Sequence, residues 1–325
     1  MFGPGNAQLP LPPDPPPAAE PADLVETAPA GVNAADLYQR AFDLLDQLTS
    51  EEKGLLRDWR TNAVPPELCA KLEPVAALAT EARSATHTDW GVEWVGFETQ
   101  LKHLGPAMNL ARALVWHAAR CRGADTAGAG GDILATLRLG QAVSDPGFVI
   151  SHLVDSAIQT QSLDYLAEHL HALPAESVAQ LAAGLSDQAY EESMFRALEM
   201  EAAAVEFEAE RLAAGLERRA GWPDELGQLT RDQLVAEIRK VAAWEREWVT
   251  ALEWTDTAYA AWRARLDVEL QTNPVARVFM PSLDGFIERT RATVVQRALV
   301  LAAADRKSTR LNSSHSSVSR MPSSA

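Results

Sequence analysis

The sequence has little of what marks disulfide-rich, membrane-spanning or nucleic-acid-binding proteins. It contains two cysteines, Cys69 and Cys121, which we interpret as giving neither a disulfide framework nor a CxxC metal knuckle. It has no run of about 18 apolar residues, so no segment is expected to cross a bilayer. Its 29 basic residues are outnumbered by 45 acidic ones, and the net charge of −16 argues against nucleic acid and anionic membrane surfaces as partners.

Catalytic signatures are also missing. The sequence has no GxSxG turn, no P-loop and no GxGxxG after a strand, so it offers no nucleophile elbow and no phosphate cradle. Short groups with suitable residue types do occur: His117 with Cys121, Glu168 with His171, and Ser151 with His152 and Asp155.

None of these three groups is sufficient for chemistry. The first has metal-ligand spacing, but a zinc site needs three or four ligands and no second half-site follows. The second is one ExxH element, whereas a di-iron site needs two plus further glutamates. The third lies on one helical turn, whereas a catalytic relay needs groups that converge from separate segments. We therefore expect no metal, no cofactor and no enzyme activity.

Helical periodicity dominates what is present. Three apolar-striped helices are expected at 105–122, from Asp132 to about Ser144, and at 148–170, with a Gly/Ala/Asp turn at Gly123–Gly131. The short connections make these helices antiparallel neighbours. The fold class predicted is all-α, an irregular α-solenoid or helical bundle with a long antiparallel coiled-coil hairpin.

The composition divides the chain into five parts. Residues 1–31 are rich in proline and are expected to be a disordered leader. The parts that follow are a helical core at 32–186, a long helical hairpin at 187–272, a truncated C-terminal helix at 273–304 and a disordered tail at 305–325. Within the core, Asn33 is expected to cap one helix and Thr49 with Glu52 to form a capping box.

The hairpin is predicted from a seven-residue apolar repeat on two segments. On Glu191–Arg219 the seam includes Leu198, Val205 and Leu212, and on Thr230–Gln271 it includes Leu234, Val241, Trp248 and Trp262. The longer arm would extend about 60 Å if it were unbroken. Gly221-Trp222-Pro223 separates the arms, Glu245 interrupts the seam, and the glutamates at 199, 201, 206, 208 and 210 are expected to be solvated.

Two groups of side chains are candidate sites. Trp90, Trp94 and Phe97 lie in an aromatic-rich loop, where they either plug the end of the helical stack or form an exposed contact site. Arg138 lies eight residues before Pro146 and Asp155 nine after it, so they should meet across an antiparallel turn as a structural ion pair.

Two resemblances bear on this interpretation. Leu110–Pro146, with LARALVWHAARCRGAD followed by GDILATLRLGQAVSDP, resembles a degenerate tetratricopeptide-type hairpin. More broadly, Asp89-Trp90, the central helices and Asn273-Pro274 with Met280-Pro281 resemble a family of bacterial all-helical proteins that has no assigned activity. The resemblance implies a membrane-targeting segment before this region and a pseudopilin-like tail after it.

The last 21 residues have a different character. From Asp305 the chain reads DRKSTRLNSSHSSVSRMPSSA, which resembles the translation of a short-read sequencing adapter. The segment has no helical period, so we expect it to be an unstructured artefact that the fold does not need.

These observations favour a non-enzymatic helical scaffold or protein–protein interaction protein. It is expected to be a monomer with a protein partner, and cytoplasmic by default because no signal peptide is visible. The alternative is a cell-envelope component associated with secretion or pilus-like assembly. An enzyme of unrecognised type is the third possibility.

Overall fold

The computed structural model describes residues 31–60, 65–186, 189–217, 222–251, 256–280 and 283–318. These ranges form α-helices and the connections between them, and contain isolated β-bridges but no strand, so the all-α prediction is confirmed. The predicted leader falls almost wholly outside them. The helices are α1 (Ala34–Asp46), α2 (Ser50–Leu55), α3 (Pro66–Ala82), α4 (Leu104–Arg120), α5 (Thr126–Ser144), α6 (Val149–His169), α7 (Ala175–Ser186), α8 (Ala189–Ala213), α9 (Arg231–Ala251), α10 (Asp256–Thr272), α11 (Pro274–Phe279) and α12 (Leu283–Val318).

Local signals set several helix starts. The Asn33 side chain accepts a hydrogen bond from the Ala35 amide at the start of α1. Thr49 and Glu52 form the predicted capping box, in which each side chain bonds the other residue's backbone amide. Such caps satisfy amides that have no partner within the helix.

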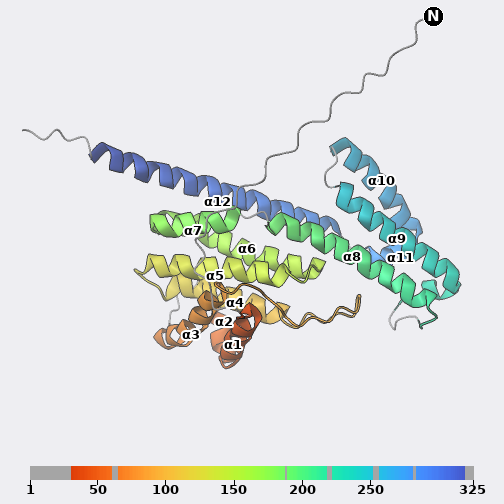
Figure 1. Ribbon diagram of the computed structural model, residues 1–325, viewed down its shortest axis with the longest axis horizontal. Helices are drawn as coiled ribbons and strands as arrows, with labels where there is room; N and C mark the ends of the chain where they lie inside the picture. Colours follow the sequence, from red (N-terminus) through yellow and green to blue (C-terminus); the bar gives the residue numbers. More distant parts are fainter. Residues whose placement is uncertain are drawn as a thin grey trace, which may run out of the picture.

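The helices are arranged in successive layers. In Figure 1, α1–α3 lie at one side, α4 and α5 cover them, α6 and α7 form the next layer, and α12 lies along the far side of α6 and α7. One apolar core joins the first layers and includes Leu72, Leu110 and Leu139. A second joins α4–α7 to α12 and includes Ile133, Leu166 and Val300. The α8–α11 helices project to one side around a third core.

Helix α5 begins earlier than expected. The predicted turn at Gly123–Gly131 is largely helical, because the Asp125 side chain caps α5 by accepting from the Gly128 amide at 2.9 Å. Glycine also allows close packing here, since a Cβ at Gly130 would lie 2.9 Å from the Ser177 Cβ on α7. The Gly-rich stretch is therefore a contact face between two helices.

Helices α8 and α9 pack antiparallel along much of their length. Arg231 at the start of α9 donates to the Gly215 carbonyl just beyond the end of α8, and Arg246 further along α9 pairs with Glu206. The seam residues Leu198, Val205, Leu212, Leu234 and Val241 are buried in the third core.

The prediction of one long helix over Thr230–Gln271 is wrong. The arm is two helices, α9 and α10, and α10 folds back on α9. Lys240 contacts Glu269 at 3.1 Å, whereas Trp248, further along α9, lies opposite Trp262 with ring centroids 5.5 Å apart. Folding back buries both indoles, which a single extended arm would leave with one neighbouring helix. Leu252–Thr255, between the two helices, lie outside the described residues.

The solvated glutamate face also needs correction. Glu199 and Glu210 are exposed, but Glu208 is fully buried and its carboxylate accepts from Arg211 at 2.7 Å. The seam glutamate, Glu245, is buried as well. Burial raises its pKa well above the ordinary value, and the nearby Glu201 carboxylate raises it further.

Helix α12 does not end near residue 304. It continues to Val318, into the segment predicted to be unstructured. Adding residues to an existing helix costs little, because each new residue gains a backbone hydrogen bond. Lys307 also donates to the carbonyls of Leu170 and His171 at 3.0 Å, beyond the end of α6.

Candidate functional site

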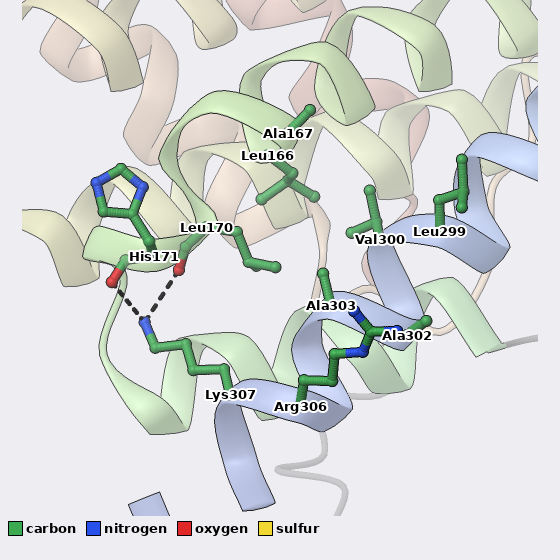
Figure 2. Close-up of a pocket in the computed structure, with 10 residues that line it drawn as sticks. All are labelled: Leu166, Ala167, Leu170, His171, Leu299, Val300, Ala302, Ala303, Arg306 and Lys307. Atoms are coloured by element: carbon green, nitrogen blue, oxygen red, sulfur yellow. Dashed lines mark hydrogen bonds between the residues drawn. The ribbon is translucent and has the colours of Figure 1, made fainter. Parts of the chain in front are cut away.

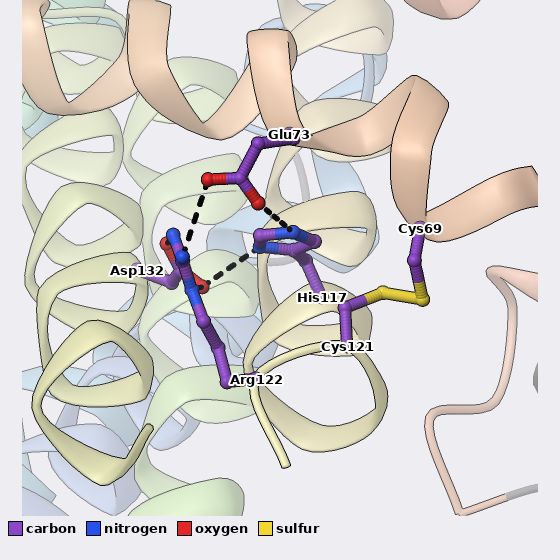
Figure 3. The surroundings of a disulfide bond; sticks show 6 residues. All are labelled: Cys69, Glu73, His117, Cys121, Arg122 and Asp132. Carbon is purple, nitrogen blue, oxygen red and sulfur yellow. Dashed lines mark hydrogen bonds and ion pairs between the residues drawn. A yellow bond between two sulfur atoms is a disulfide. The ribbon is translucent and has the colours of Figure 1, made fainter. Parts of the chain in front are cut away.

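Two successive contacts join α3 to α4. A disulfide links Cys69 to Cys121 with Cα atoms 5.4 Å apart, and one helical turn along, Glu73 Oε2 lies 3.2 Å from His117 Nε2 (Figure 3). The two cysteines were expected to give no disulfide framework, and the structure joins them in a single disulfide. Cys69 and Glu73 are four residues apart, as are His117 and Cys121, so antiparallel packing of the two helices brings both pairs together.

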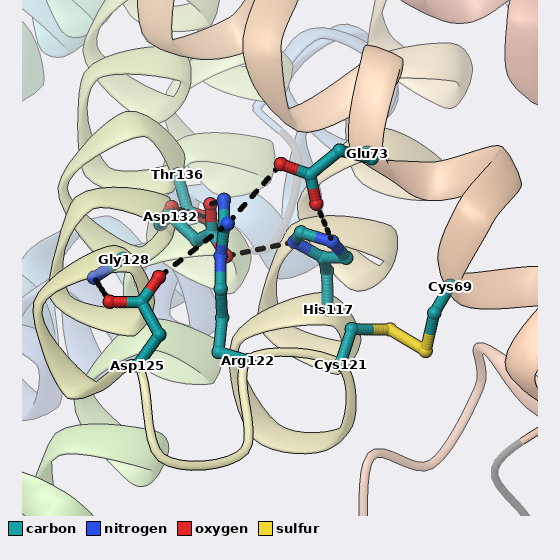
Figure 4. A network of polar contacts seen from close by, with 9 residues as sticks. All are labelled: Cys69, Glu73, His117, Cys121, Arg122, Asp125, Gly128, Asp132 and Thr136. Atoms are coloured by element: carbon teal, nitrogen blue, oxygen red, sulfur yellow. Dashed lines mark hydrogen bonds and ion pairs between the residues drawn. A yellow bond between two sulfur atoms is a disulfide. The ribbon is translucent and has the colours of Figure 1, made fainter.

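His117 belongs to a larger polar network. Its Nδ1 lies 2.9 Å from Asp132 Oδ2 on α5, and both side chains are only 1% exposed. Arg122 binds the same carboxylate through two hydrogen bonds of 2.9 Å and also reaches Glu73 at 3.3 Å (Figure 4). The bond to Asp132 raises the pKa of the Arg122 guanidinium.

This network is built to connect helices. Both ring nitrogens of His117 face carboxylates, although the Nε2 contact with Glu73 lacks hydrogen-bond geometry. Asp132 is held by an imidazole and a bidentate guanidinium, an arrangement that fixes orientation strongly. The network therefore encloses the His117 ring between two carboxylates, and it ties α3, α4 and α5 together.

A second buried polar group lies between α6, α8 and α12. His152 is fully buried, with Nδ1 2.8 Å from the Ser193 hydroxyl and Nε2 3.2 Å from the Thr290 hydroxyl. Burial lowers the pKa of its imidazole to about 4, so the ring is neutral at pH 7. Next to it, the Ser156 and Tyr190 hydroxyls bond each other at 2.7 Å.

The predicted ion-pair residues occupy different environments. Arg138 is exposed and donates to Gln141 at 2.7 Å, whereas Asp155 is fully buried. Burial raises the pKa of Asp155 to about 7, while its bond to Gln159 and the positive charge of Arg297 act in the opposite direction. Arg297 itself donates to Gln159 at 2.9 Å. The cation that influences Asp155 is thus on α12, a helix far away in sequence.

The aromatic loop has one ring packed into the stack and two that are partly exposed. Trp90 plugs the stack, because its ring stacks on His103 at 4.3 Å and its Nε1 donates to the Ala142 carbonyl at 2.8 Å. Trp94 and Phe97 are 37% and 41% exposed. Each also contacts a ring of the projecting helices, Phe207 on α8 and Phe279 on α11 respectively.

A cavity lies between α6 and α12. It has a volume of about 740 Å³, and Figure 2 shows Leu166, Ala167 and Leu170 on one side facing residues of α12. Arg306 and Lys307 complete its lining. Because these two residues belong to the segment that resembles a sequencing adapter, we assign the cavity no function.

The remaining short groups do not assemble into a centre. Cys121 is in the disulfide, and Glu168 accepts from Arg60 at 2.8 Å. Across the described ranges, no three His, Cys, Asp or Glu side chains gather as a metal-binding group. Within the same ranges, no helix has both the length and the apolarity to cross a bilayer.

Comparisons with known proteins add no assignment. The chain matches no family model, no curated protein and no solved structure.

Some of the connecting residues had a usable signal in the sequence. The four-residue spacing of Cys69 with Glu73 and of His117 with Cys121 allows two paired contacts between helices that pack side by side. Arg297 stands out as a charged residue within the apolar period of the last helix. Which residues Asp132 and Arg297 would reach depends on the packing of distant helices, and no local pattern reveals it.

Proposed function

We propose that this protein is a non-enzymatic helical scaffold that docks another protein. In this proposal, α1–α7 form an irregular α-solenoid with tetratricopeptide-like pairs, and α8 with α9 form a coiled-coil hairpin. The protein acts as a monomer whose partner binds on the outside of the helical layers.

The proposal rests on one observation: polar side chains are buried between helices, whereas large apolar side chains are exposed on the aromatic loop. The imidazoles of His117 and His152 are buried and lie next to polar side chains of neighbouring helices at both ring nitrogens, so they serve as connectors between helices. Large apolar side chains, by contrast, are exposed close together at Trp94, Val95 and Phe97. Exposed apolar groups of this kind are typical of interaction surfaces.

In-cell photo-crosslinking tests this proposal. A photoreactive amino acid at Val95, in cells of the native host, should give a discrete crosslinked species whose partner mass spectrometry identifies and reciprocal capture confirms. The same probe at Glu51, an exposed position on α2, is the matched control. Identical crosslinking patterns at both positions would contradict docking through the aromatic loop's side of the molecule.

The disulfide favours a second candidate, a cell-envelope component. Structural disulfides persist in oxidising compartments and are rare in the cytosol. Cys69 and Cys121 are both partly exposed, so a cytosolic reductant has access to them. Thiol trapping in intact host cells tests the candidate: we expect no labelling until a reductant is added, and labelling of both cysteines without reductant would exclude it.

A further inference from the structure

Three neighbouring side chains of the aromatic loop are exposed together. Among the described residues, eight large apolar side chains are exposed, and three of them are Trp94, Val95 and Phe97 at 37%, 37% and 41%. Single exposed apolar residues are ordinary, but three within four positions of one loop, two of them aromatic, give a partner several apolar contacts close together.

The base of the loop is fixed to the helical stack. Asn33 donates its side-chain amide to the Asp89 carbonyl and accepts from the Asp89 amide, both at 2.8 Å. The adjacent Trp90 ring lies against His103 and Tyr38, and its bond to Ala142 fixes its rotation. The exposed group therefore stands on a rigid support.

The tip of the loop is also ordered. Thr99 donates its hydroxyl to the Gly96 carbonyl at 2.7 Å, and the same hydroxyl accepts from the Val95 amide at 2.9 Å. Gly96 has a φ of 71°, a conformation that favours glycine. A surface organised before binding loses little conformational entropy on binding.

The rings of Trp94 and Phe97 contact the projecting helices but remain partly exposed. Trp94 meets Phe207 edge-on at 4.9 Å, and Phe97 lies 5.6 Å from Phe279. Beside Trp94 there is a cavity of about 430 Å³, whose lining includes Phe148 and Met200. This arrangement offers a partner an aromatic surface and an adjoining hollow for an anchoring side chain, as in binding hot spots.

The charge around this surface identifies the kind of partner. Residues 88–100 contain Asp89, Glu93 and Glu98 and no lysine or arginine, and beyond them Lys102 lines a cavity together with Glu93 and Glu98. Asp145 lines the same cavity from the α5–α6 turn, where Arg196 contacts it at 3.6 Å. Complementary charges favour the correct partner and disfavour an acidic one.

We propose that the exposed surface of Trp94, Val95 and Phe97 docks a basic segment of a partner protein, one in which lysine or arginine flanks an apolar anchor residue. The apolar residue enters the hollow beside Trp94, and the basic groups lie against the acidic residues of the loop. This inference rests on the proposed docking function and adds the site and the chemistry of the partner.

Selection from a displayed library of random short peptides, with the full chain as bait, tests the inference. We expect the enriched peptides to combine lysine or arginine with an apolar residue. Fluorescence anisotropy of a labelled enriched peptide should show binding roughly tenfold or more weaker to Val95→Glu. Glu93→Lys should also bind more weakly, whereas Glu51→Lys, the same charge change on α2, should bind like the unchanged protein.

The outcomes separate this inference from the broader proposal. Enriched peptides that are acidic or uncharged, or that bind every variant equally, would overturn the docking site assigned here, while a confirmed partner in photo-crosslinking would still support a docking function. A selection that enriches no peptide would also overturn the site. Circular dichroism and melting establish that each variant is folded, and Glu93→Lys carries the test if Val95→Glu is not.

Discussion

Glu73 Oε2 lies 3.2 Å from His117 Nε2, one helical turn from the disulfide that joins the same two helices. Cys69 and Glu73 belong to α3, and His117 and Cys121 to the end of α4, so a covalent and a polar contact fix the register of this helix pair together. Asp132 and Arg122 extend the contact to α5. The stack thus has a rigid edge, to which the chain leading into the aromatic loop is attached.

Reduction of the disulfide should lower stability. Cys69 and Cys121 are separated by 52 residues. Closing a loop of this length in the unfolded chain stabilises the folded state by up to about 4 kcal/mol. Chemical denaturation with and without dithiothreitol should show the loss, and the Cys69→Ser/Cys121→Ser variant should be insensitive to the reductant. Equal midpoints for the oxidised and reduced protein would show that the bond does not form.

The two carboxylates beside His117 should differ in importance. Asp132 is buried and bonds both His117 and Arg122, so Asp132→Ala leaves the buried Nδ1 of His117 without its partner and removes the bidentate contact of Arg122, and should cost about 3 kcal/mol. Glu73 is 61% exposed, and Glu73→Ala should cost under about 1 kcal/mol. Urea unfolding of the two variants measures the contrast, and similar losses for both would disprove the central position of Asp132.

Asp155 should make stability fall as pH rises. Its folded-state pKa of about 7 lies above the ordinary value of 3.8. Between these pH values the folded chain binds more protons than the unfolded chain, so the free energy of unfolding decreases with rising pH. The full loss of stability from ionising the buried carboxyl is present above about pH 7. Asp155→Asn removes this ionisation, while the amide oxygen can still accept from Gln159. The variant should gain most over the wild type near pH 8, and parallel pH profiles for the two proteins would refute the assignment.

The α8–α9 pairing should be intramolecular and sensitive to buried charge. Val205 is fully buried between these helices, so Val205→Asp should cost about 4 kcal/mol, whereas the exposed Glu199→Ala should change stability by under about 0.5 kcal/mol. Sedimentation velocity of the wild type should show a monomer at every concentration. A dimer that Val205→Asp separates into folded monomers would mean that the seams pair between chains.

Local sequence patterns predicted most of the helices but not how distant helices meet. Asn33 and the Thr49–Glu52 capping box marked helix starts because their hydrogen bonds lie within a few residues. The return of α10 onto α9 escaped prediction because the seven-residue period continues through both helices, and only the burial of Trp248 against Trp262 distinguishes a folded arm from a straight one.

The candidate site shows the same division. Trp90, Trp94 and Phe97 were identifiable as a group from composition, since large aromatic side chains in a loop need either a core or a partner. Trp90 became the anchor and the other two rings stayed partly exposed because of contacts with Ala142, Phe207 and Phe279. These residues come from three other helices. Likewise, Asp155 was expected beside Arg138, but the charge of Arg297 acts on it from α12.

Allelic replacement in the native host tests docking most directly, because it compares one surface change with one buried polar change. Val95→Glu alters the exposed group of the aromatic loop, and Thr290→Val removes the hydroxyl beside the buried His152. With both proteins present at wild-type levels, docking predicts that the Val95→Glu strain behaves like a deletion strain and the Thr290→Val strain like the wild type. A normal Val95→Glu strain together with a defective Thr290→Val strain would contradict docking and would indicate that the buried polar groups carry the function.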